Sequence, residues 1–252
     1  LVATNNFIDF HTPSDVNSSS FTTLLLKYQC HLFLSMSYDQ KIHPKVFKMP
    51  ILGTINCHAG KLPDYKGRNI LNWALINDEN SFGITVHYID ESIDTGDVID
   101  QRTYPIHEID DYNTLLALAH QECANLLYKT TKQILLGKSR RRPQTNIRKH
   151  PIICTRRKEG DEFINWNNKS RQIYNFIRAL TPPGPSARTF FNTTNISIYR
   201  AKYISDAPTY LGIPGAIISV DNNSFLVKTS DTYISILEWN PIFIPRVGMR
   251  LH

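Results

Sequence analysis

Short apolar runs and helical patterns alternate over the first half of the chain. Runs of apolar residues bounded by turn-forming residues predict buried strands, and apolar residues recurring every three or four positions predict helices. The predicted strands cover residues 32–35, 83–89 and 98–106, and the predicted helices cover residues 21–29, 70–77 and 112–136. Strands that alternate with helices are typical of an α/β sheet.

The longest helical pattern covers residues 112–136. Its apolar face is predicted from residues spaced three and four apart, namely Leu116, Ala119, Cys123, Leu127, Thr130 and Ile134. Asp111 precedes this pattern and can cap the helix start with its side chain. Gly137 follows it and can adopt the left-handed conformation that ends many helices. We expect this helix to pack on the sheet.

The pattern changes to short strands in the second half of the chain. One helix is predicted at residues 171–180, with Ile173, Phe176, Ile177 and Leu180 on its inner face. Beyond it, strands are predicted at residues 196–204, 215–220, 225–228 and 233–238, with Asp221-Asn222-Asn223 as a hairpin turn. We therefore expect an α/β domain over residues 1–150, a basic linker at its end over residues 139–150, and a smaller β-rich domain over residues 151–252.

Two polar blocks, residues 55–69 and 90–97, each follow an apolar run. Residues 49–52 precede the first block and the predicted strand 83–89 precedes the second. Both blocks should therefore lie where strands end. Open α/β sheets bind their ligands at that place, so these blocks are where candidate chemistry is expected.

Asn56 and His58 lie two residues apart, so on an extended segment both side chains point to the same face. Cys57 lies between them and should point into the core. Asp94 precedes Gly96 in a turn-prone segment that could bring its carboxylate to the same face. An amide, an imidazole and a carboxylate together suit acyl transfer. An ordinary turn at the end of a strand would carry the same Asn-x-His spacing.

Composition narrows the class of protein and of partner. A net charge of +6 and a pI near 9.1 suit an anionic partner, either a nucleic acid or a nucleotide-bearing small molecule. The basic run 138–142 is more simply a solvated linker than a binding patch. The four cysteines form no CxxC pair, so we expect neither a metal site nor a disulfide scaffold. No apolar run is long enough to cross a bilayer and no signal peptide opens the chain, so we expect a cytoplasmic protein.

The polar blocks closely resemble those of the folate-dependent formyltransferases. The resemblance rests on Asn56-Cys57-His58, Leu62-Pro63, Tyr65, Gly67, Trp73, Gly83, Thr85, Val86 and Asp94-Thr95-Gly96. This family includes methionyl-tRNA formyltransferase, glycinamide ribonucleotide formyltransferase and the sugar N-formyltransferases. The resemblance implies N10-formyltetrahydrofolate as formyl donor, a primary amine as acceptor, and Asn56, His58 and Asp94 as catalytic residues.

The chain departs from the family in two respects. Gly60-Lys61 stands where many members have Ser followed by Leu. Only 55 residues precede Asn56, whereas members usually carry more of the sheet ahead of this point. The resemblance therefore implies an α/β, Rossmann-like formyltransferase domain that is shortened at its N-terminus, followed by a smaller β-rich, OB-like C-terminal domain.

The resemblance also implies binding residues. Residues 37–44 resemble the family segment that borders the pterin, although an ordinary loop would look much the same. The expected folate contacts are Tyr38, Gln40, Lys41, Ile42, Asp90 and Glu91. Residues 68–73 and 177–185 resemble sugar N-formyltransferases, which act on nucleotide-linked amino sugars. The expected substrate contacts are Lys66, Arg68, Asn69, Trp73, Arg178 and Thr181. Arg171 and Arg178 could form a face that meets phosphate, or plain solvent surface.

The expected function is formyl transfer to the amine of a dTDP- or UDP-linked amino sugar, for lipopolysaccharide O-antigen biosynthesis. The expected partners are tetrahydrofolate and the sugar nucleotide, without nucleic acid or membrane, and a homodimer is compatible with this function. One alternative is methionyl-tRNA formylation, which the basic charge would also suit and which steep salt dependence would favour. A second is a folate-binding protein that catalyses no transfer.

Overall fold

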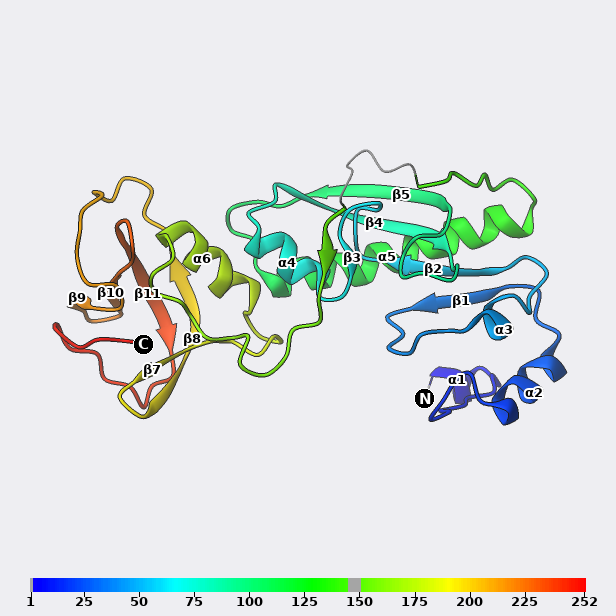
Figure 1. The fold of residues 1–252 in the computed structure, drawn as a ribbon, viewed down its shortest axis with the longest axis horizontal. Helices are drawn as coiled ribbons and strands as arrows, with labels where there is room; N and C mark the ends of the chain where they lie inside the picture. Colours follow the sequence, from blue (N-terminus) through cyan, green and yellow to red (C-terminus); the bar gives the residue numbers. More distant parts are fainter. Residues whose placement is uncertain (1, 145–150) are drawn as a thin grey trace.

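The computed structural model of the chain describes residues 2–144 and 151–252. Two lobes lie side by side along its long axis, the N-terminal strands in one and the C-terminal strands in the other (Figure 1). Helix α4 (Ile70–Ile76) of the first lobe packs against helix α6 (Ser170–Ala179) of the second. The expected order, an α/β domain followed by a β-rich domain, is confirmed.

The N-terminal sheet has four strands in the order β1-β2-β4-β5. They are β1 (Phe33–Met36), β2 (Thr54–His58), β4 (Ser81–Tyr88) and β5 (Val98–Pro105). Strand β1 runs parallel to β2, whereas β4 runs antiparallel to both of its neighbours. Tyr88, the last residue of β4, therefore pairs with Ile55 near the start of β2. The loop after β4 must turn back along the sheet to reach the end of β2.

The two polar blocks do not start from the same edge of the sheet. They leave it from opposite ends, because β4 is antiparallel to β2. Strand β4 is buried along nearly its whole length. A continuous apolar run of this kind is usual for parallel strands, so the sequence pattern gave no sign of the reversal.

Helix α5 (Tyr112–Leu135) packs across the sheet, against β2, β4 and β5. Its start is capped as expected, because the Asp111 side chain accepts a hydrogen bond from the Thr114 N–H and the Thr114 hydroxyl accepts one from the Asp111 N–H. Its end is also as expected: Gly137 has a φ of 65° and donates its N–H to the Ile134 carbonyl.

The buried face of α5 is shifted by one residue from the predicted face at two positions. The fully buried residues are Leu115, Ala119, Cys123, Leu126, Thr130 and Ile134. The predicted Leu116 and Leu127 are only partly buried against the core. Spacings of three and four are satisfied by either leucine of each Leu-Leu pair, so the position of the sheet decides which one is buried.

Three short helices complete the N-terminal lobe, namely α1 (Val2–Asn5), α2 (Ser19–Tyr28) and α3 (Pro44–Phe47). The predicted helix start at Phe21 with Ser20 as its cap is wrong. Helix α2 begins two residues earlier, because the Ser18 hydroxyl accepts a hydrogen bond from the Phe21 N–H. Several serines in a row offer the same cap chemistry, so the sequence alone did not select one.

Residues 141–144 are bound to the N-terminal sheet and do not form a free linker. Arg142 exchanges backbone hydrogen bonds with Val98, and the Arg141 guanidinium lies 3.7 Å from the centre of the Tyr88 ring. The rest of the predicted linker, 145–150, lies outside the described residues. Two residue pairs then form a small parallel ladder, β3 (Lys66–Gly67) with β6 (Ile153–Cys154). Because Cys154 packs in the N-terminal core, we propose that the second domain begins after it.

The C-terminal lobe is an antiparallel sheet in the order β7-β8-β11-β10-β9. Its strands are β7 (Ala187–Phe191), β8 (Thr194–Lys202), β9 (Ile217–Asp221), β10 (Ser224–Lys228) and β11 (Tyr233–Trp239). Strand β7 was not predicted, because it follows a proline-rich turn and has little alternation. The two-residue turn between Asp221 and Ser224 agrees with the predicted hairpin.

The last residues of the chain close this sheet. Ile217 of β9 donates its N–H to the Met249 carbonyl, and Leu251 donates to the Gly215 carbonyl. His252 then exchanges hydrogen bonds with Phe190 of β7 at the opposite edge. The segment therefore bridges both edge strands, which closes the sheet in the manner of an OB-like barrel.

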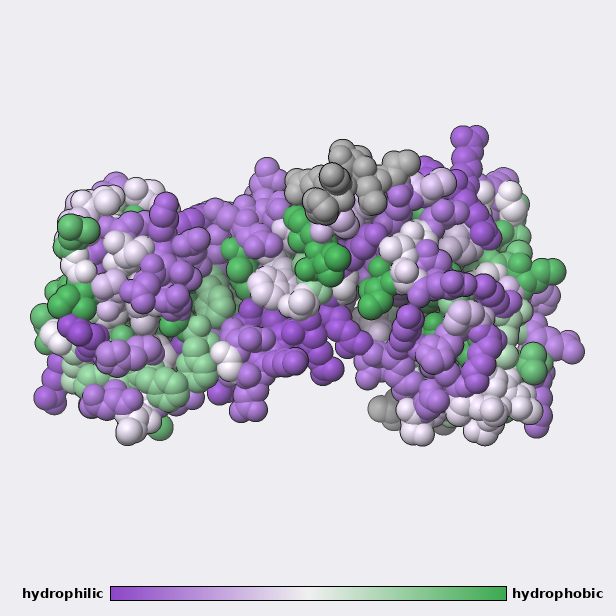
Figure 2. All heavy atoms as spheres, viewed as in Figure 1, coloured by the Kyte–Doolittle hydropathy of each residue, from purple (hydrophilic) through white to green (hydrophobic). Residues whose placement is uncertain are grey.

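The surface is mainly hydrophilic on the face seen in Figure 2, including the waist below the junction of the two lobes. Among the described residues, helices that combine enough length and hydropathy to span a membrane are absent. The apolar side chains gather instead in two cores, one in each lobe.

The shifted face of α5 can be tested by comparing neighbouring leucines. Leu115→Ala should lower the free energy of unfolding by about 2–5 kcal/mol, because Leu115 is 1% exposed and truncation leaves a cavity. Leu116→Ala should cost less, because this side chain is only partly buried. Urea-induced unfolding followed by circular dichroism measures both. An equal or larger loss for Leu116→Ala would contradict the observed helix face.

Candidate active site

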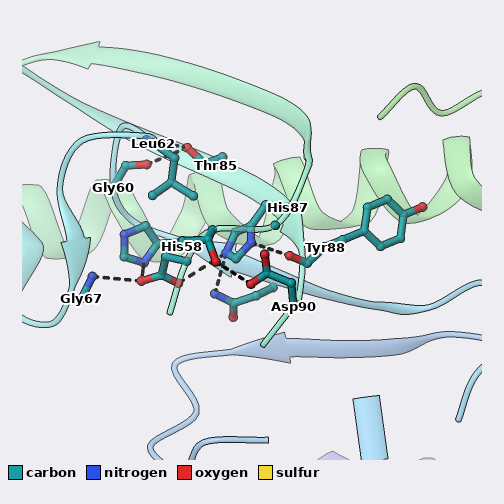
Figure 3. Close-up of polar contacts among 12 residues, drawn as sticks. His58, Gly60, Leu62, Gly67, Thr85, His87, Tyr88 and Asp90 are labelled. Atoms are coloured by element: carbon teal, nitrogen blue, oxygen red, sulfur yellow. Dashed lines mark hydrogen bonds and ion pairs between the residues drawn. The ribbon is translucent and has the colours of Figure 1, made fainter. Parts of the chain in front are cut away.

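Strands β2 and β4 bring three polar side chains together. Asn56 of β2 pairs with His87 of β4 across the ladder, and His58 lies two residues further along β2. The rings of His58 and His87 lie nearly perpendicular, with their centres 6.4 Å apart. Figure 3 shows the two imidazoles side by side. Cys57 points the other way into the N-terminal core, where it is 4% exposed, as predicted.

Asp94 reaches this cluster from the loop that turns back after β4. Its Oδ2 lies 3.7 Å from His58 Nδ1, and its Oδ1 lies 3.4 Å from His87 Nε2. The Gly67 N–H donates a hydrogen bond of 2.9 Å to Oδ2 (Figure 3). Asp94 has a φ of 54°, which is uncommon for residues other than glycine. The structure therefore brings Asn56, His58 and Asp94 together, with His87 as an additional member.

Backbone carbonyls fix the proton positions of both histidines, because a carbonyl oxygen only accepts. His58 Nε2 lies 2.8 Å from the Tyr65 carbonyl, so this nitrogen carries the proton and Nδ1 faces Asp94. His87 Nδ1 lies 2.8 Å from the Tyr88 carbonyl and carries its proton there. His87 Nε2 is then free to accept from Asn56 Nδ2 at 3.3 Å. This contact orients the Asn56 amide and leaves its second N–H for the cleft.

Burial determines the charge on His58. It lowers the pKa of His58, and the negative charge of Asp94 and the bond to the Tyr65 carbonyl offset this only in part. Burial also opposes ionisation of Asp94, but the polar groups around the carboxylate, including the Gly67 N–H that donates to it, outweigh burial and lower the pKa of this carboxyl. The site thus combines a neutral imidazole with a carboxylate at neutral pH.

Small and polar residues around His58 hold it in place. A Cβ atom on Gly60 would overlap His58 Nε2 and the Tyr65 carbonyl, so this position requires glycine. The Gly60 carbonyl accepts a hydrogen bond of 2.6 Å from the Thr85 hydroxyl (Figure 3). Gln101 donates in turn to Thr85 Oγ1 at 2.8 Å. The glycine in the segment that departs from the family pattern is therefore required by the geometry here.

The cluster lies in a cleft of about 1250 Å³. All six residues expected to contact folate line this cleft, namely Tyr38, Gln40, Lys41, Ile42, Asp90 and Glu91. Three of the residues expected to contact substrate also line it, namely Lys66, Arg68 and Asn69. Among the described residues, groups of three or more His, Cys, Asp or Glu placed to hold a metal are absent.

Lys66 stands out among the residues that line the cleft. It is 9% exposed, and its ammonium group has no hydrogen-bond or ion-pair partner among the described residues. A lysine ammonium can bind an anionic ligand group as a point charge. Lys41, Arg68 and Arg156 line the same cleft and add to its positive charge.

The structure places the remaining three expected substrate contacts outside the cleft. Trp73 donates its Nε1–H to the Thr155 carbonyl. Arg178 is 6% exposed and donates to Asn175 Oδ1 and to the His107 and Asp110 carbonyls. The Thr181 hydroxyl donates to the Arg178 carbonyl at the end of α6. These side chains serve contacts within the protein and between its lobes.

The face formed by Arg171 and Arg178 does not meet phosphate in the way considered from the sequence. Arg171 binds Asp78 and Glu108 of the N-terminal lobe, at 2.6 and 2.5 Å. Arg178 lies 3.7 Å from the same Asp78. The helical spacing was read correctly, but the acidic partners come from distant parts of the sequence. Both arginines therefore join the lobes.

Two residues of the site were not found from the sequence, His87 and Gln144. His87 lies two residues after Thr85 in an otherwise apolar strand, and this single buried histidine was an available signal. The Gln144 side chain donates to the Asp94 and Gly96 carbonyls, at 2.9 and 2.8 Å. It lies 50 residues from Asp94 in sequence, inside the segment predicted to be a linker.

Two sequence profiles match the chain. The profile described as "Formyl transferase" matches residues 3–131, and the profile described as "Formyl transferase, C-terminal domain" matches residues 157–242. Among curated proteins, methionyl-tRNA formyltransferase of Pelotomaculum thermopropionicum is 34% identical over 226 residues. That alignment covers 90% of this chain and 71% of the relative.

Two solved structures share the fold. HypX from Aquifex aeolicus superposes with a TM-score of 0.67 at 19% identity, over 94% of this chain and 42% of that chain. This chain therefore spans less than half the length of HypX. The N-formyltransferase from Helicobacter canadensis, solved with folinic acid and dTDP-3-aminofucose, gives a TM-score of 0.67 at 24% identity. The superposition covers 94% of this chain and 81% of that one.

Acid should destabilise the protein through His58. Because burial lowers its pKa, the unfolded chain binds a proton that the folded chain lacks, and the free energy of unfolding falls as the pH drops below about 6.5. His58→Gln should weaken this dependence. His120→Gln, at an exposed histidine of α5, should leave it unchanged. Urea-induced unfolding between about pH 5 and pH 8 measures this pH dependence of the free energy of unfolding. A wild-type slope in His58→Gln would contradict the neutral, buried imidazole.

Proposed function

Because this chain belongs to the formyl transferase family, we propose that it transfers a formyl group from N10-formyltetrahydrofolate to the primary amine of a nucleotide-linked amino sugar. The observation that carries the proposal is the convergence of Asn56, His58 and Asp94 in one cleft. An amide donor, a neutral imidazole and a carboxylate are the groups that acyl transfer to an amine requires.

The proposed reaction begins with attack of the neutral amine on the formyl carbon. A carbon–nitrogen bond forms, and the carbonyl oxygen becomes an oxyanion. The Asn56 N–H that is free of His87 donates to this oxyanion. His87 supports this role of Asn56. Its Nε2 accepts one N–H of the Asn56 amide, so the NH2 group of the amide faces the cleft.

Proton transfer in the proposed reaction uses His58 Nδ1. The other ring nitrogen donates to the Tyr65 carbonyl and is not available. Nδ1 accepts the proton that the attacking amine loses, and the resulting imidazolium is stabilised by Asp94. The bond between the formyl carbon and N10 then breaks, and the proton passes to N10 of the leaving tetrahydrofolate. The products are a formamide and tetrahydrofolate, so atoms and charge balance.

The size and charge of the cleft support two ligands at once. Pockets for one small molecule usually measure about 300–1,000 Å³, and this cleft measures about 1250 Å³. We assign the folate to the wall formed by Tyr38, Gln40, Lys41 and Ile42. The ammonium of Lys66, beside Gly67 and its contact to Asp94, suits the diphosphate of the acceptor. The ligands of the Helicobacter canadensis neighbour support this pairing.

A second candidate acceptor is methionyl-tRNA. It is favoured by the relative at 34% identity, which is a methionyl-tRNA formyltransferase. The phosphates of tRNA would also suit Lys66 and the net charge of +6. The two acceptors differ in salt dependence, because each neutralised phosphate of a single strand adds about 0.7 to the log-log slope of binding against salt.

A panel of acceptors separates these functions. Formyl transfer from N10-formyltetrahydrofolate should be measured with dTDP- and UDP-linked amino sugars and with methionyl-tRNA. We expect turnover of one sugar nucleotide, lost in His58→Ala, with a shallow salt dependence. Turnover of tRNA alone would assign the second candidate. Folate binding without formyl transfer to any amine would refute the proposed activity. The chain would then be a folate-binding protein.

Removing the Asn56 amide tests its role directly. Asn56→Ala should lower kcat about 100-fold to 1,000-fold, because one donor to the oxyanion is lost. Asn113→Ala removes an exposed amide of α5 and should leave kcat unchanged. Steady-state kinetics with saturating N10-formyltetrahydrofolate measure kcat of both variants. A loss in Asn56→Ala of less than about threefold would show that this amide does not stabilise the transition state.

A further inference from the structure

The loop that carries Asp94 adopts a conformation that needs support. Asp94 has a left-handed φ of 54°, a region that non-glycine residues occupy only when their surroundings hold them there. Within the loop, the Thr95 hydroxyl donates a hydrogen bond of 2.6 Å to Oδ1 of Asp90, which lies at the N-terminal end of the loop. At its end, Asp97 accepts a hydrogen bond from the Tyr88 N–H. Neither contact involves the backbone of Asp94 itself.

The Gln144 side chain does contact the backbone of Asp94. Its Nε2 donates to the Asp94 carbonyl at 2.9 Å and to the Gly96 carbonyl at 2.8 Å. One amide nitrogen thus spans the left-handed residue and the glycine two positions later. A Cβ atom on Gly96 would overlap the Tyr88 carbonyl, so the loop lies directly against the end of β4. Gln144 therefore fixes the backbone from which the Asp94 carboxylate points to both histidines.

The chemistry of the glutamine side chain suits this position. Its amide offers two N–H donors on one nitrogen without adding charge. A lysine or arginine could also donate to two carbonyls, but would place a positive charge beside the network of His58, His87 and Asp94. Glutamate has the same shape and has no donor when ionised. Gln144 Oε1 is buried and lacks a hydrogen-bond partner among the described residues, so the side chain serves the loop with its nitrogen alone.

The segment that carries Gln144 is itself anchored. Arg142 exchanges two backbone hydrogen bonds with Val98 of β5, at 2.8 and 2.9 Å. The Arg141 guanidinium stacks 3.7 Å from the centre of the Tyr88 ring. The Tyr88 carbonyl in turn accepts the proton of His87 Nδ1. Residues 141–144 are therefore held against the sheet, and this segment ends at the loop that carries Asp94.

We propose that Gln144 is a positioning residue for formyl transfer, which acts by holding the Asp94 loop in the orientation that His58 requires. This proposal rests on the proposed function for its kinetic consequences. Its structural consequence is independent of the acceptor. Without the two hydrogen bonds, the Asp94 carboxylate moves relative to His58 Nδ1, and the imidazolium formed during the reaction loses its counter-charge.

The kinetic test compares Gln144→Ala and Gln144→Glu with the wild-type chain. Both variants should lower kcat about tenfold to 100-fold with little change in KM, because misplacement of a catalytic group by about 1 Å has effects of this size. Gln121→Ala, at an exposed glutamine of α5, is the matched control and should keep wild-type kcat. Retention of kcat within about twofold in Gln144→Ala would overturn the proposal.

A double-mutant cycle with Asp94→Asn separates positioning from a general loss of structure. If Gln144 acts through Asp94, adding Gln144→Ala to Asp94→Asn should lower kcat by less than about threefold further. A full additional loss in the double variant would show that Gln144 acts on the fold and not through Asp94.

A second readout needs neither folate nor acceptor. The pKa of His58, followed by NMR titration of its imidazole, is raised by the Asp94 charge in the wild-type chain and should fall in Gln144→Ala. It should stay unchanged in Gln121→Ala. An unchanged pKa in Gln144→Ala would overturn the positioning role. If the wild-type chain transfers formyl to no acceptor while this pKa shift is observed, the proposed function fails and the positioning of Asp94 stands.

Discussion

A buried carboxylate, that of Asp94, constrains the arrangement of the whole cleft. A charge removed from water is costly unless hydrogen-bond donors and opposite charges surround it. Here the Gly67 N–H donates to the carboxylate, and the rings of His58 and His87 lie 3.7 and 3.4 Å from its oxygens. Both rings depend on a further contact, because backbone carbonyls hold the outer nitrogen of each one. The left-handed backbone at Asp94 and the close packing at Gly60 follow from this requirement.

The cleft lies in the first lobe, and the second lobe packs beside it with its own core. The C-terminal lobe is a sheet whose edges are bridged by the last residues of the chain, and it has a core of its own. It joins the first lobe through α4 and α6, where Asn72 donates to the Ala179 carbonyl and Arg171 binds Asp78. The cleft is lined instead by the N-terminal lobe and the residues that return to it near β6. The cleft walls therefore come from the first lobe and these returning residues, whereas α4 and α6 hold the two lobes together.

Family membership and acceptor choice rest on different features. The profiles cover both lobes, and the cluster of Asn56, His58 and Asp94 lies within the first of them. The two proposed acceptors differ in the group that carries the amine, but both contain phosphate. Lys66 and the other basic residues of the cleft suit phosphate in either one. The positive charge of the cleft therefore does not by itself select the acceptor.

The sequence by itself determined the order of domains, the ends of α5 and the inward direction of Cys57. These features depend on local periodicity, capping and turn chemistry, which neighbouring residues specify. Only the tertiary structure decided the antiparallel direction of β4, the presence of His87 in the cluster, and the partners that draw Arg178 away from the cleft. It also decided that Gln144 reaches Asp94 across 50 residues. Such contacts join residues that are distant in sequence, so their pairing depends on how the elements pack and has no local signal.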